Sequence, residues 1–224
     1  MKVFTALTGT LLLGCATVMA QDASLTQRAA TGPIRWAEGA PNATSEVKND
    51  AKIEGLKTDD VQIYISMADL KETEYNRVWV QIYNHSKAPV SVDPQTAILL
   101  TEKDKTIRAE VPDKAANSIQ KYGEAKSQEL SSAHCNNMTA TQCQPTPSQA
   151  QVAKQVAAFS AQQAQWIRDN ALAQKNLAPG QDTQGFIVFK KEKKKANYIL
   201  KLTVGSQPFE FPVTADNKAP SFAD

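Results

Sequence analysis

The chain has 224 residues, of which 42% are hydrophobic and 21% charged, and its formal net charge at pH 7 is +2. This apolar content is too high, and the net charge too low, for a wholly disordered chain. One apolar stretch, at the N-terminus, approaches membrane length, which excludes a polytopic membrane protein. The near-neutral charge creates no global field that would draw the chain to nucleic acid. We therefore expect a soluble globular domain of about 150–200 residues with extensions.

Residues 1–20 have the order of a secretory signal peptide, with a basic start followed by an apolar run. Two processing sites are open. The run Leu12-Leu13-Gly14-Cys15 resembles a bacterial lipobox, in which a lipid on Cys15 would attach the chain to a membrane. Cleavage after Ala20 would instead release a free protein. Both predict an extracytoplasmic protein, which is periplasmic, anchored at the outer membrane or secreted.

The composition changes after the signal segment. Residues 21–50 are rich in Ala, Thr, Gly, Pro, Asn and Ser, which predicts a flexible tether that could contain a short ordered piece around Ile34-Arg35-Trp36. Trp36 is the one residue there that needs a surface to bury its ring, either on a partner or on its own domain. At the other end of the chain, residues 215–224 form a polar tail.

Two cysteines follow the signal segment, Cys135 and Cys143, with seven residues between them. In an oxidising compartment such a pair is typical of a local disulfide. The alternatives are two free thiols or a metal site. Metal is disfavoured because only His134 lies nearby, whereas soft four-coordinate sites need more Cys or His ligands. We predict a disulfide between Cys135 and Cys143.

Alternation of apolar and polar residues predicts strands on both sides of a long alanine-rich region. The predicted strands are 61–67, 77–83, 90–92 with 96–101, 106–111, 183–189, 197–204 and 208–213. They fall into two blocks, 51–111 and 177–214, whose combined length is close to the roughly 100 residues of a seven-stranded immunoglobulin-like sandwich. The expected fold is therefore mainly β, an immunoglobulin-like β-sandwich.

Residues 112–176 separate the two blocks and have helical rather than strand periodicity. Segment 113–132 and segment 148–174 both place apolar residues at steps of three and four. The cysteine loop lies between them, and Pro179 and Gly180 follow the second segment as stop signals. This pattern predicts an α-helical hairpin inserted into the sandwich, which loop entropy tolerates because it grows slowly with length.

The strand blocks carry two turn motifs. The first is Tyr83-Asn84-His85-Ser86 followed by Pro89-Val90-Ser91-Val92, and the second is Leu177-Ala178-Pro179-Gly180 followed by Gly185-Phe186-Ile187-Val188-Phe189. Both resemble uncharacterised immunoglobulin-like domains of bacterial lipoproteins and secreted envelope proteins. The resemblance covers the strand blocks only. It implies a sandwich that binds proteins or sugars, or acts as a spacer, and it implies no reaction.

A search for catalytic motifs finds no G-x-S-x-G, H-E-x-x-H, phosphate-binding glycine loop or C-x-x-C. His85 lies in a turn and is expected at the surface. His134 precedes Cys135, but adjacent side chains rarely face each other and a disulfide would occupy the sulfur. We expect no catalytic residue, no metal and no cofactor. A pair of carboxylates from distant parts of the chain remains the enzymatic alternative.

Two features are candidates for binding. The first is a run of five lysines between two predicted strands, Lys190, Lys191, Lys193, Lys194 and Lys195. It could contact phosphate headgroups or an acidic polymer, or it could be a solvated hairpin tip that discourages aggregation. No aromatic residue is interleaved, so single-stranded nucleic acid is not indicated.

The second candidate is a stripe of Phe159, Trp166 and Ile167 on the second predicted helix. It could dock a partner, or it could be core that packs on the sandwich or on the first helix. We expect a non-enzymatic binding or scaffold protein of the bacterial cell envelope, with an envelope protein as partner of the helical insertion. The alternatives are an envelope hydrolase or carbohydrate-active protein with scattered carboxylates, and an assembly or chaperone-like factor that holds its partner with the insertion.

Overall fold

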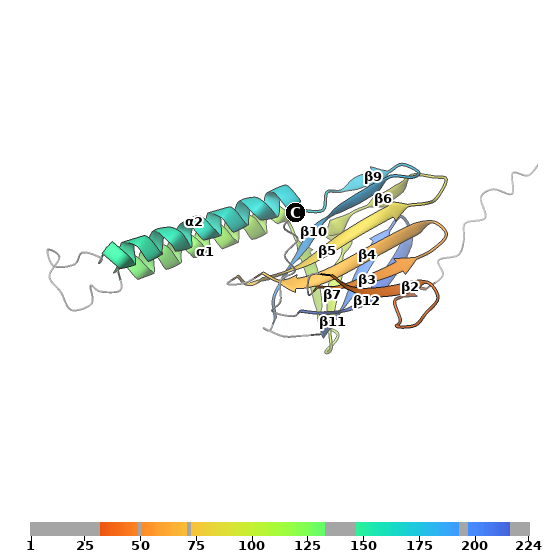
Figure 1. Ribbon diagram of the computed structural model, residues 1–224, viewed down its shortest axis with the longest axis horizontal. Coiled ribbons are helices and arrows are strands. Elements are labelled where there is room, and N and C mark those ends of the chain that lie inside the picture. Colours follow the sequence, from red (N-terminus) through yellow and green to blue (C-terminus); the bar gives the residue numbers. More distant parts are fainter. Residues whose placement is uncertain (1–31, 49–50, 71–72, 133–146, 193–196, 216–224) are drawn as a thin grey trace, which may run out of the picture.

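The computed structural model describes residues 32–48, 51–70, 73–132, 147–192 and 197–215 (Figure 1). They form one curled β-sheet from which a long two-helix hairpin projects. The helices are α1 (Pro112–Ser132) and α2 (Pro147–Asn170), with a short 3-10 turn at Pro94–Thr96. The strands are β1 (Ile34–Arg35), β2 (Ala43–Lys48), β3 (Ala51–Lys57), β4 (Val61–Asp69), β5 (Tyr75–Asn84), β6 (Val90–Val92), β7 (Ile98–Thr101), β8 (Thr106–Glu110), β9 (Lys175–Leu177), β10 (Asp182–Lys190), β11 (Asn197–Val204) and β12 (Gln207–Thr214).

The sheet follows the order β1-β12-β11-β7-β8-β10-β5-β4-β3-β2, and β6 pairs with β11 and β9 beside this path. Neighbouring strands are antiparallel, except that β1 runs parallel to β12. The period of two that predicts strands in the sequence is visible in β5, where Val78, Val80 and Ile82 are buried while Trp79 and Gln81 between them are half-buried. Burial of one side of each strand is what curls the sheet around an interior.

The predicted two-sheet sandwich is wrong. Strand β8 pairs with β7 through Arg108 and Ile107, and with β10 through Glu110 and Ala109. It therefore joins the halves that a sandwich would keep apart, and the ten strands of the path form one mixed sheet curled into a half-barrel. Alternation in the sequence identifies which side of a strand is buried but not which strand lies beside it, so it could not distinguish two packed sheets from one curled sheet.

Both strand blocks contribute to one interior. Among its largest fully buried side chains, Ile63 and Leu99 come from the early block, and Phe189, Phe209 and Phe211 come from the late block. A second, smaller cluster lies where the hairpin meets the sheet and includes Leu70, Ile119, Ile167 and Val188. The hairpin is thus attached to the sheet at its base and extends away from it (Figure 1).

Part of the segment that the composition assigns to a tether is strand. Residues 34–48 contain β1 and β2, and β2 pairs along its whole length with β3. Trp36 is buried on its own domain, and its indole Nε1 donates a hydrogen bond to the Thr44 carbonyl oxygen at 3.0 Å. Cys15, Cys135, Cys143, Lys193, Lys194, Lys195 and the polar tail beyond residue 215 lie outside the described residues.

The predicted helical hairpin is present between β8 and β9. Helix α2 ends at Asn170, four residues earlier than the sequence pattern suggests. The reason is that Leu172 enters the main core and its backbone N–H donates to the Phe186 carbonyl oxygen at 2.9 Å. The segment that follows α2 is therefore hydrogen-bonded directly to strand β10.

Candidate functional site

The buried positions of the hairpin are mostly occupied by small residues. They are Ala115, Ala116, Ile119 and Gly123 on α1, and Ala153, Ser160, Ala164 and Ile167 on α2. A Cβ atom built on Gly123 would lie 2.1 Å from the Ser160 Oγ atom, far inside van der Waals contact. Glycine is thus required at this point because the two helix backbones approach each other closely.

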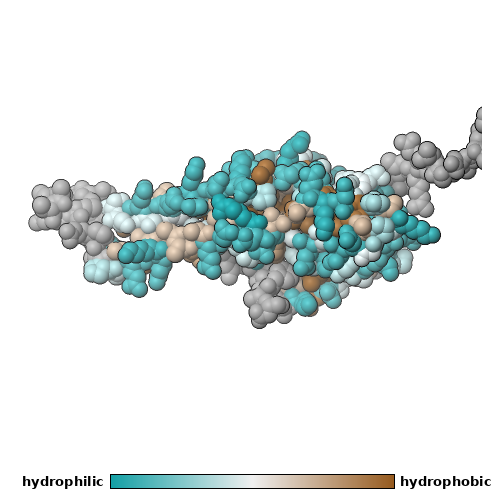
Figure 2. All heavy atoms as spheres, turned by 90° about the horizontal axis from the view of Figure 1, so that it is seen from above, coloured by the Kyte–Doolittle hydropathy of each residue, from teal (hydrophilic) through white to brown (hydrophobic). Residues whose placement is uncertain are grey.

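Several large side chains of the same helices are left at the surface. Tyr122 is 60% exposed, and Val152 and Phe159 are each 45% exposed. Along the hairpin, hydrophobic residues run between hydrophilic ones (Figure 2). Small residues occupy most of the buried positions between the helices, so these larger side chains are left about half exposed.

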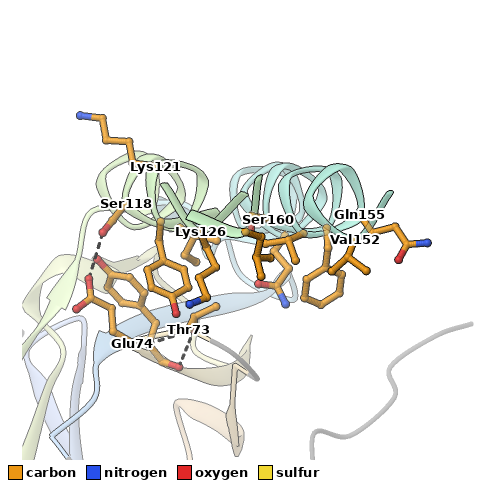
Figure 3. Close-up of a pocket in the computed structure, with 15 residues that line it drawn as sticks. Thr73, Glu74, Ser118, Lys121, Lys126, Val152, Gln155 and Ser160 are labelled. Carbon is orange, nitrogen blue, oxygen red and sulfur yellow. Dashed lines mark hydrogen bonds between the residues drawn. The ribbon is translucent and has the colours of Figure 1, made fainter. Parts of the chain in front are cut away.

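The exposed residues line an open groove of about 1010 Å³ (Figure 3). One wall comes from α1, the other comes from α2, and the end nearest the sheet is closed by the residues that lead into β5. The lining residues are Thr73, Glu74, Tyr75, Ser118, Ile119, Lys121, Tyr122, Lys126, Leu130, Val152, Gln155, Val156, Phe159, Ser160 and Gln163. We call this feature the hairpin groove.

Polar groups are placed at the sheet end and on the α1 wall of the hairpin groove. Glu74 accepts a hydrogen bond from the Ser118 hydroxyl at 3.1 Å (Figure 3). The other carboxylate oxygen of Glu74 lies 3.4 Å from the Lys190 Nζ atom. Lys126 donates to the Glu129 carboxylate at 2.8 Å, and this hydrogen bond raises the pKa of the lysine. Lys121 points away from the other labelled side chains of the groove (Figure 3).

The predicted stripe on α2 does not act as one surface. Phe159 lies in the hairpin groove, but Ile167 is buried in the cluster at the hairpin base. Trp166 is half-buried, with its ring centroid 4.6 Å from that of Phe186. The Arg77 guanidinium lies 4.8 Å from the Trp166 ring, and burial lowers the pKa of this arginine. Trp166 and Ile167 therefore attach the hairpin to the sheet.

Tyr122 and Val152 are not among the site residues predicted from the sequence. Both lie at helical steps in the pattern that predicts the hairpin, so their helix was predicted but their exposure was not. The spacing of small residues on the two helices is the sequence signal that could have predicted this exposure. Gly123, Ala153 and Ser160 mark the side on which the helices meet, and this leaves the larger residues on another side.

The described lysines of the predicted basic run make internal contacts. Lys191 donates from its Nζ atom to the carbonyl oxygens of Leu70 at 2.9 Å and Thr73 at 2.8 Å. Its backbone N–H donates to the Glu74 carbonyl oxygen at 2.7 Å. Together with the contact between Lys190 and Glu74, these bonds fix the turn that closes the hairpin groove. The two lysines thus support the groove from the sheet side.

The remaining polar residues show no assembled catalytic group in the described part of the chain. His85 is exposed, stacks on Tyr83 and lies 3.3 Å from the Gln62 side-chain oxygen. Two carboxyl groups have shifted pKa values, but each has its own cations. Burial raises the pKa of Glu54, which is bound by Lys52. Hydrogen bonds from Lys201 and Arg35 lower the pKa of Glu210.

No group of three or more His, Cys, Asp or Glu side chains within the described ranges is placed to hold a metal ion. Over the same ranges, no helix has the length and apolar character needed to cross a bilayer. Comparison of the chain with protein-family models, with curated proteins and with solved structures finds no match. Function is therefore inferred from the groove and its surroundings.

Proposed function

We propose that this chain is a non-enzymatic binding protein of the bacterial cell envelope and that it holds a protein partner in the hairpin groove. One observation supports this proposal above the others. The two helices bury small residues against each other and leave Tyr122, Val152 and Phe159 at the surface. Contiguous exposed apolar surface of this kind is typical of an interaction site.

The energetic reason is the hydrophobic effect. Complete burial of one large aliphatic or aromatic side chain contributes about 1.5–3 kcal/mol. Because the groove side chains are already partly covered by their neighbours, a partner would gain only a fraction of this for each residue. Several such residues in one groove are enough for a specific contact, with aromatic Tyr122 and Phe159 as its strongest anchors.

The occupant that fits this groove best is an amphipathic helix. Ile119, Tyr122, Lys126 and Leu130 on α1, and Val152, Val156, Phe159 and Gln163 on α2, follow steps of three and four residues. Walls with this spacing accept a third helix that presents apolar residues at the same intervals. The eleven steps from Ile119 to Leu130 span about 17 Å at 1.5 Å per residue, which corresponds to about three helical turns.

Charged residues at the hairpin groove would also favour one orientation of a bound helix. Lys126 is on the α1 wall, and Glu74 closes the sheet end. An acidic residue of a partner helix would compete with Glu129 for Lys126, and a basic residue would join Lys190 at Glu74. We propose a helix of another protein as the occupant.

The envelope location is supported by residues 1–20 alone. Intact-mass measurement of the protein purified from its native cells tests it. Export predicts either a diacylated chain that begins at Cys15 or an unmodified chain that begins at Gln21. A chain that retains residues 1–20 would contradict export. The same spectrum reports the two-proton loss expected for a disulfide between Cys135 and Cys143.

Photo-crosslinking in the native cells tests the groove. Benzoylphenylalanine is placed at Phe159 or Val152, and at Gln162 as a matched control because Gln162 is exposed on α2 but does not line the groove. We expect one discrete crosslinked protein at both groove positions and not at the control. The crosslinked peptide should have apolar residues three and four positions apart. Equal crosslinking at Gln162, or none at the groove positions, would contradict the proposal.

A substitution then separates binding from folding. Phe159→Asp places a charge in the apolar groove and should abolish binding of the crosslinked protein, whereas Gln162→Asp should retain it. Both variants should keep the helical circular dichroism of the wild type, because both positions are exposed. Undiminished binding by Phe159→Asp would show that the groove is not the contact surface.

A further inference from the structure

A second concave region lies at the end of the curled sheet where β4 ends and β11 begins, and it shares no lining residue with the hairpin groove. Here β3 and β4 face β11 and β12 across a cavity of about 520 Å³. Antiparallel pairing sets Glu54 opposite Ile65 and Tyr198 opposite Val213, so each pair shares one side of the sheet. Ile65, Tyr198 and Val213 belong to the core, and the cavity is therefore the open mouth of the sheet interior.

Glu54 is an unusual residue for this position. It is only 5% exposed, although charged residues are rarely buried. Its Oε1 atom accepts a hydrogen bond from the Lys52 Nζ atom at 2.6 Å, while its Oε2 atom is buried without a hydrogen-bond partner. Burial raises the pKa of this carboxyl against the opposing effect of Lys52. A buried polar atom left without a partner destabilises the fold, so its presence calls for an explanation.

Lys52 fixes the charge balance of the cavity. Its ammonium group binds Glu54 and lies 5.0 Å from the centroid of the Trp36 ring. Its side chain is 59% exposed, which places the cation at the rim of the cavity while the carboxylate lies inside. Lys52 and Glu54 are the charged residues that line the cavity, so their ion pair leaves its lining neutral, and the buried Oε2 atom is an acceptor without a donor.

We propose that this cavity binds a small neutral amphiphile, whose apolar body packs against Ile65, Met67 and Val213 and whose hydroxyl or amine donates to the Glu54 Oε2 atom. The volume lies within the range of about 300–1,000 Å³ found for small-molecule sites, which often occupy the mouths of β-barrels. A neutral head matches the neutral ion pair, and a donor is required because the free carboxylate oxygen accepts. This site is independent of the hairpin groove.

Fluorescence titration of the full chain with 1-aminoanthracene tests the proposal, since this probe has an apolar body and one amine donor. We expect saturable, blue-shifted emission. Competition with 1-octanol should displace the probe at least tenfold more effectively than competition with 1-methoxyheptane, which has the same number of heavy atoms but no donor. Equal displacement by the ether would overturn the role of the donor.

Substitution of Glu54 distinguishes a role in ligand binding from a role in stabilising the fold through an ion pair. Glu54→Leu should weaken probe binding at least tenfold and raise the melting temperature, because it removes a buried Oε2 atom that lacks a hydrogen-bond partner. Glu46→Leu, on the exposed strand β2, is the matched control and should change neither value. A lower melting temperature for Glu54→Leu would show that the ion pair is structural, and unchanged probe binding would show that Glu54 is no anchor. Either result overturns the proposal.

The hairpin groove is also apolar, so the location of the signal must be shown. The Phe159→Asp variant is titrated in parallel and should keep the blue-shifted emission. Loss of emission in Phe159→Asp, with retention in Glu54→Leu, would assign the probe to the hairpin groove and refute the cavity site. That result would leave the proposed function of the groove intact.

Discussion

The sheet and the hairpin use large side chains in opposite ways. In the sheet, Phe189, Phe209 and Phe211 are fully buried and fill the interior. In the hairpin, the buried positions are mainly Ala, Gly and Ser, while Tyr122 and Phe159 are about half exposed. The sheet therefore uses its apolar residues for its own stability. The hairpin leaves part of its apolar surface exposed.

The hairpin must then be stable for other reasons. Its sequence is rich in alanine, which has the highest helix propensity. Its base is attached to the sheet by the contacts among Trp166, Phe186 and Arg77. The two helices are joined to each other near that base by an ion pair between Arg168 and Asp113 at 3.3 Å. A long arm built in this way keeps its shape without burying its largest residues. Four substitutions test this contrast with the sheet.

The largest effect is expected in the sheet interior. Phe211→Ala removes a fully buried ring and leaves a cavity, which should lower the free energy of unfolding by about 3–5 kcal/mol. Chemical denaturation followed by circular dichroism measures the change. Thr214→Ala, at an exposed position of the same strand, is the control and should lower it by about 0.5 kcal/mol or less. A loss below about 1 kcal/mol for Phe211→Ala would contradict the close packing described for the interior.

The contact between the two helices should come next. In Gly123→Ala the new methyl group meets Ser160, and we expect a net loss of about 1–3 kcal/mol even though alanine favours helix. Thermal unfolding followed at 222 nm measures it. In the double variant Gly123→Ala with Ser160→Gly, the methyl group has space and stability should recover. A single variant more stable than the wild type would show that the helices are not in close contact.

The sequence predicts the local features of this molecule better than it predicts which strands and turns contact each other. The alternation in β4, β5 and β11 and the helical steps in α1 and α2 each follow from the burial of one side of an element. The turn motifs are also local, but their contact is not. The Gly180 N–H donates to the Asn84 carbonyl oxygen at 2.8 Å, and the Asn84 side chain donates to the Leu177 carbonyl oxygen at 2.9 Å. No property of either motif alone identifies the other as its partner.

The candidate sites were harder to predict for the same reason. In β2, only Val47 is a large apolar residue, and this strand forms because β3 lies beside it. Phe159 and Ile167 share a helical stripe in the sequence, but one is exposed and the other is buried because the sheet covers only the base of the hairpin. Glu54 is one charged residue in a predicted β block, and its burial depends on β11 and β12, which are distant in the sequence.

The sheet and the hairpin also differ in how much their ion pairs should contribute to stability. Hydrogen bonds from Lys201 and Arg35 lower the pKa of Glu210 below its ordinary value of 4.5. The folded state therefore favours the carboxylate, and this stabilisation is present above that value and is lost as the pH falls through the lower pKa of the folded state. The melting-temperature advantage of the wild type over Glu210→Gln should be full at pH 7 and shrink below pH 4.5.

The hairpin provides the matched control for this pH dependence. Glu129 pairs with Lys126 at 2.8 Å, but both side chains are substantially exposed, and exposed pairs contribute little to stability. Glu129→Gln should therefore unfold at nearly the wild-type temperature at each pH. A difference for Glu210→Gln that is constant from pH 7 to pH 3 would mean that the Glu210 carboxylate is not preferentially stabilised in the folded state.

The smallest effect on stability is expected where the proposed function needs the side chain most. Phe159→Ala makes the same chemical change as Phe211→Ala, but its ring is already 45% exposed in the hairpin groove. About half of this residue already contacts water in the folded chain, and alanine has the higher helix propensity, so we expect a loss of about 1 kcal/mol or less. The measurement is denaturation under the conditions used for Phe211→Ala. A loss comparable to that of Phe211→Ala would mean that Phe159 belongs to the hairpin core, and the contrast between the two regions would then disappear.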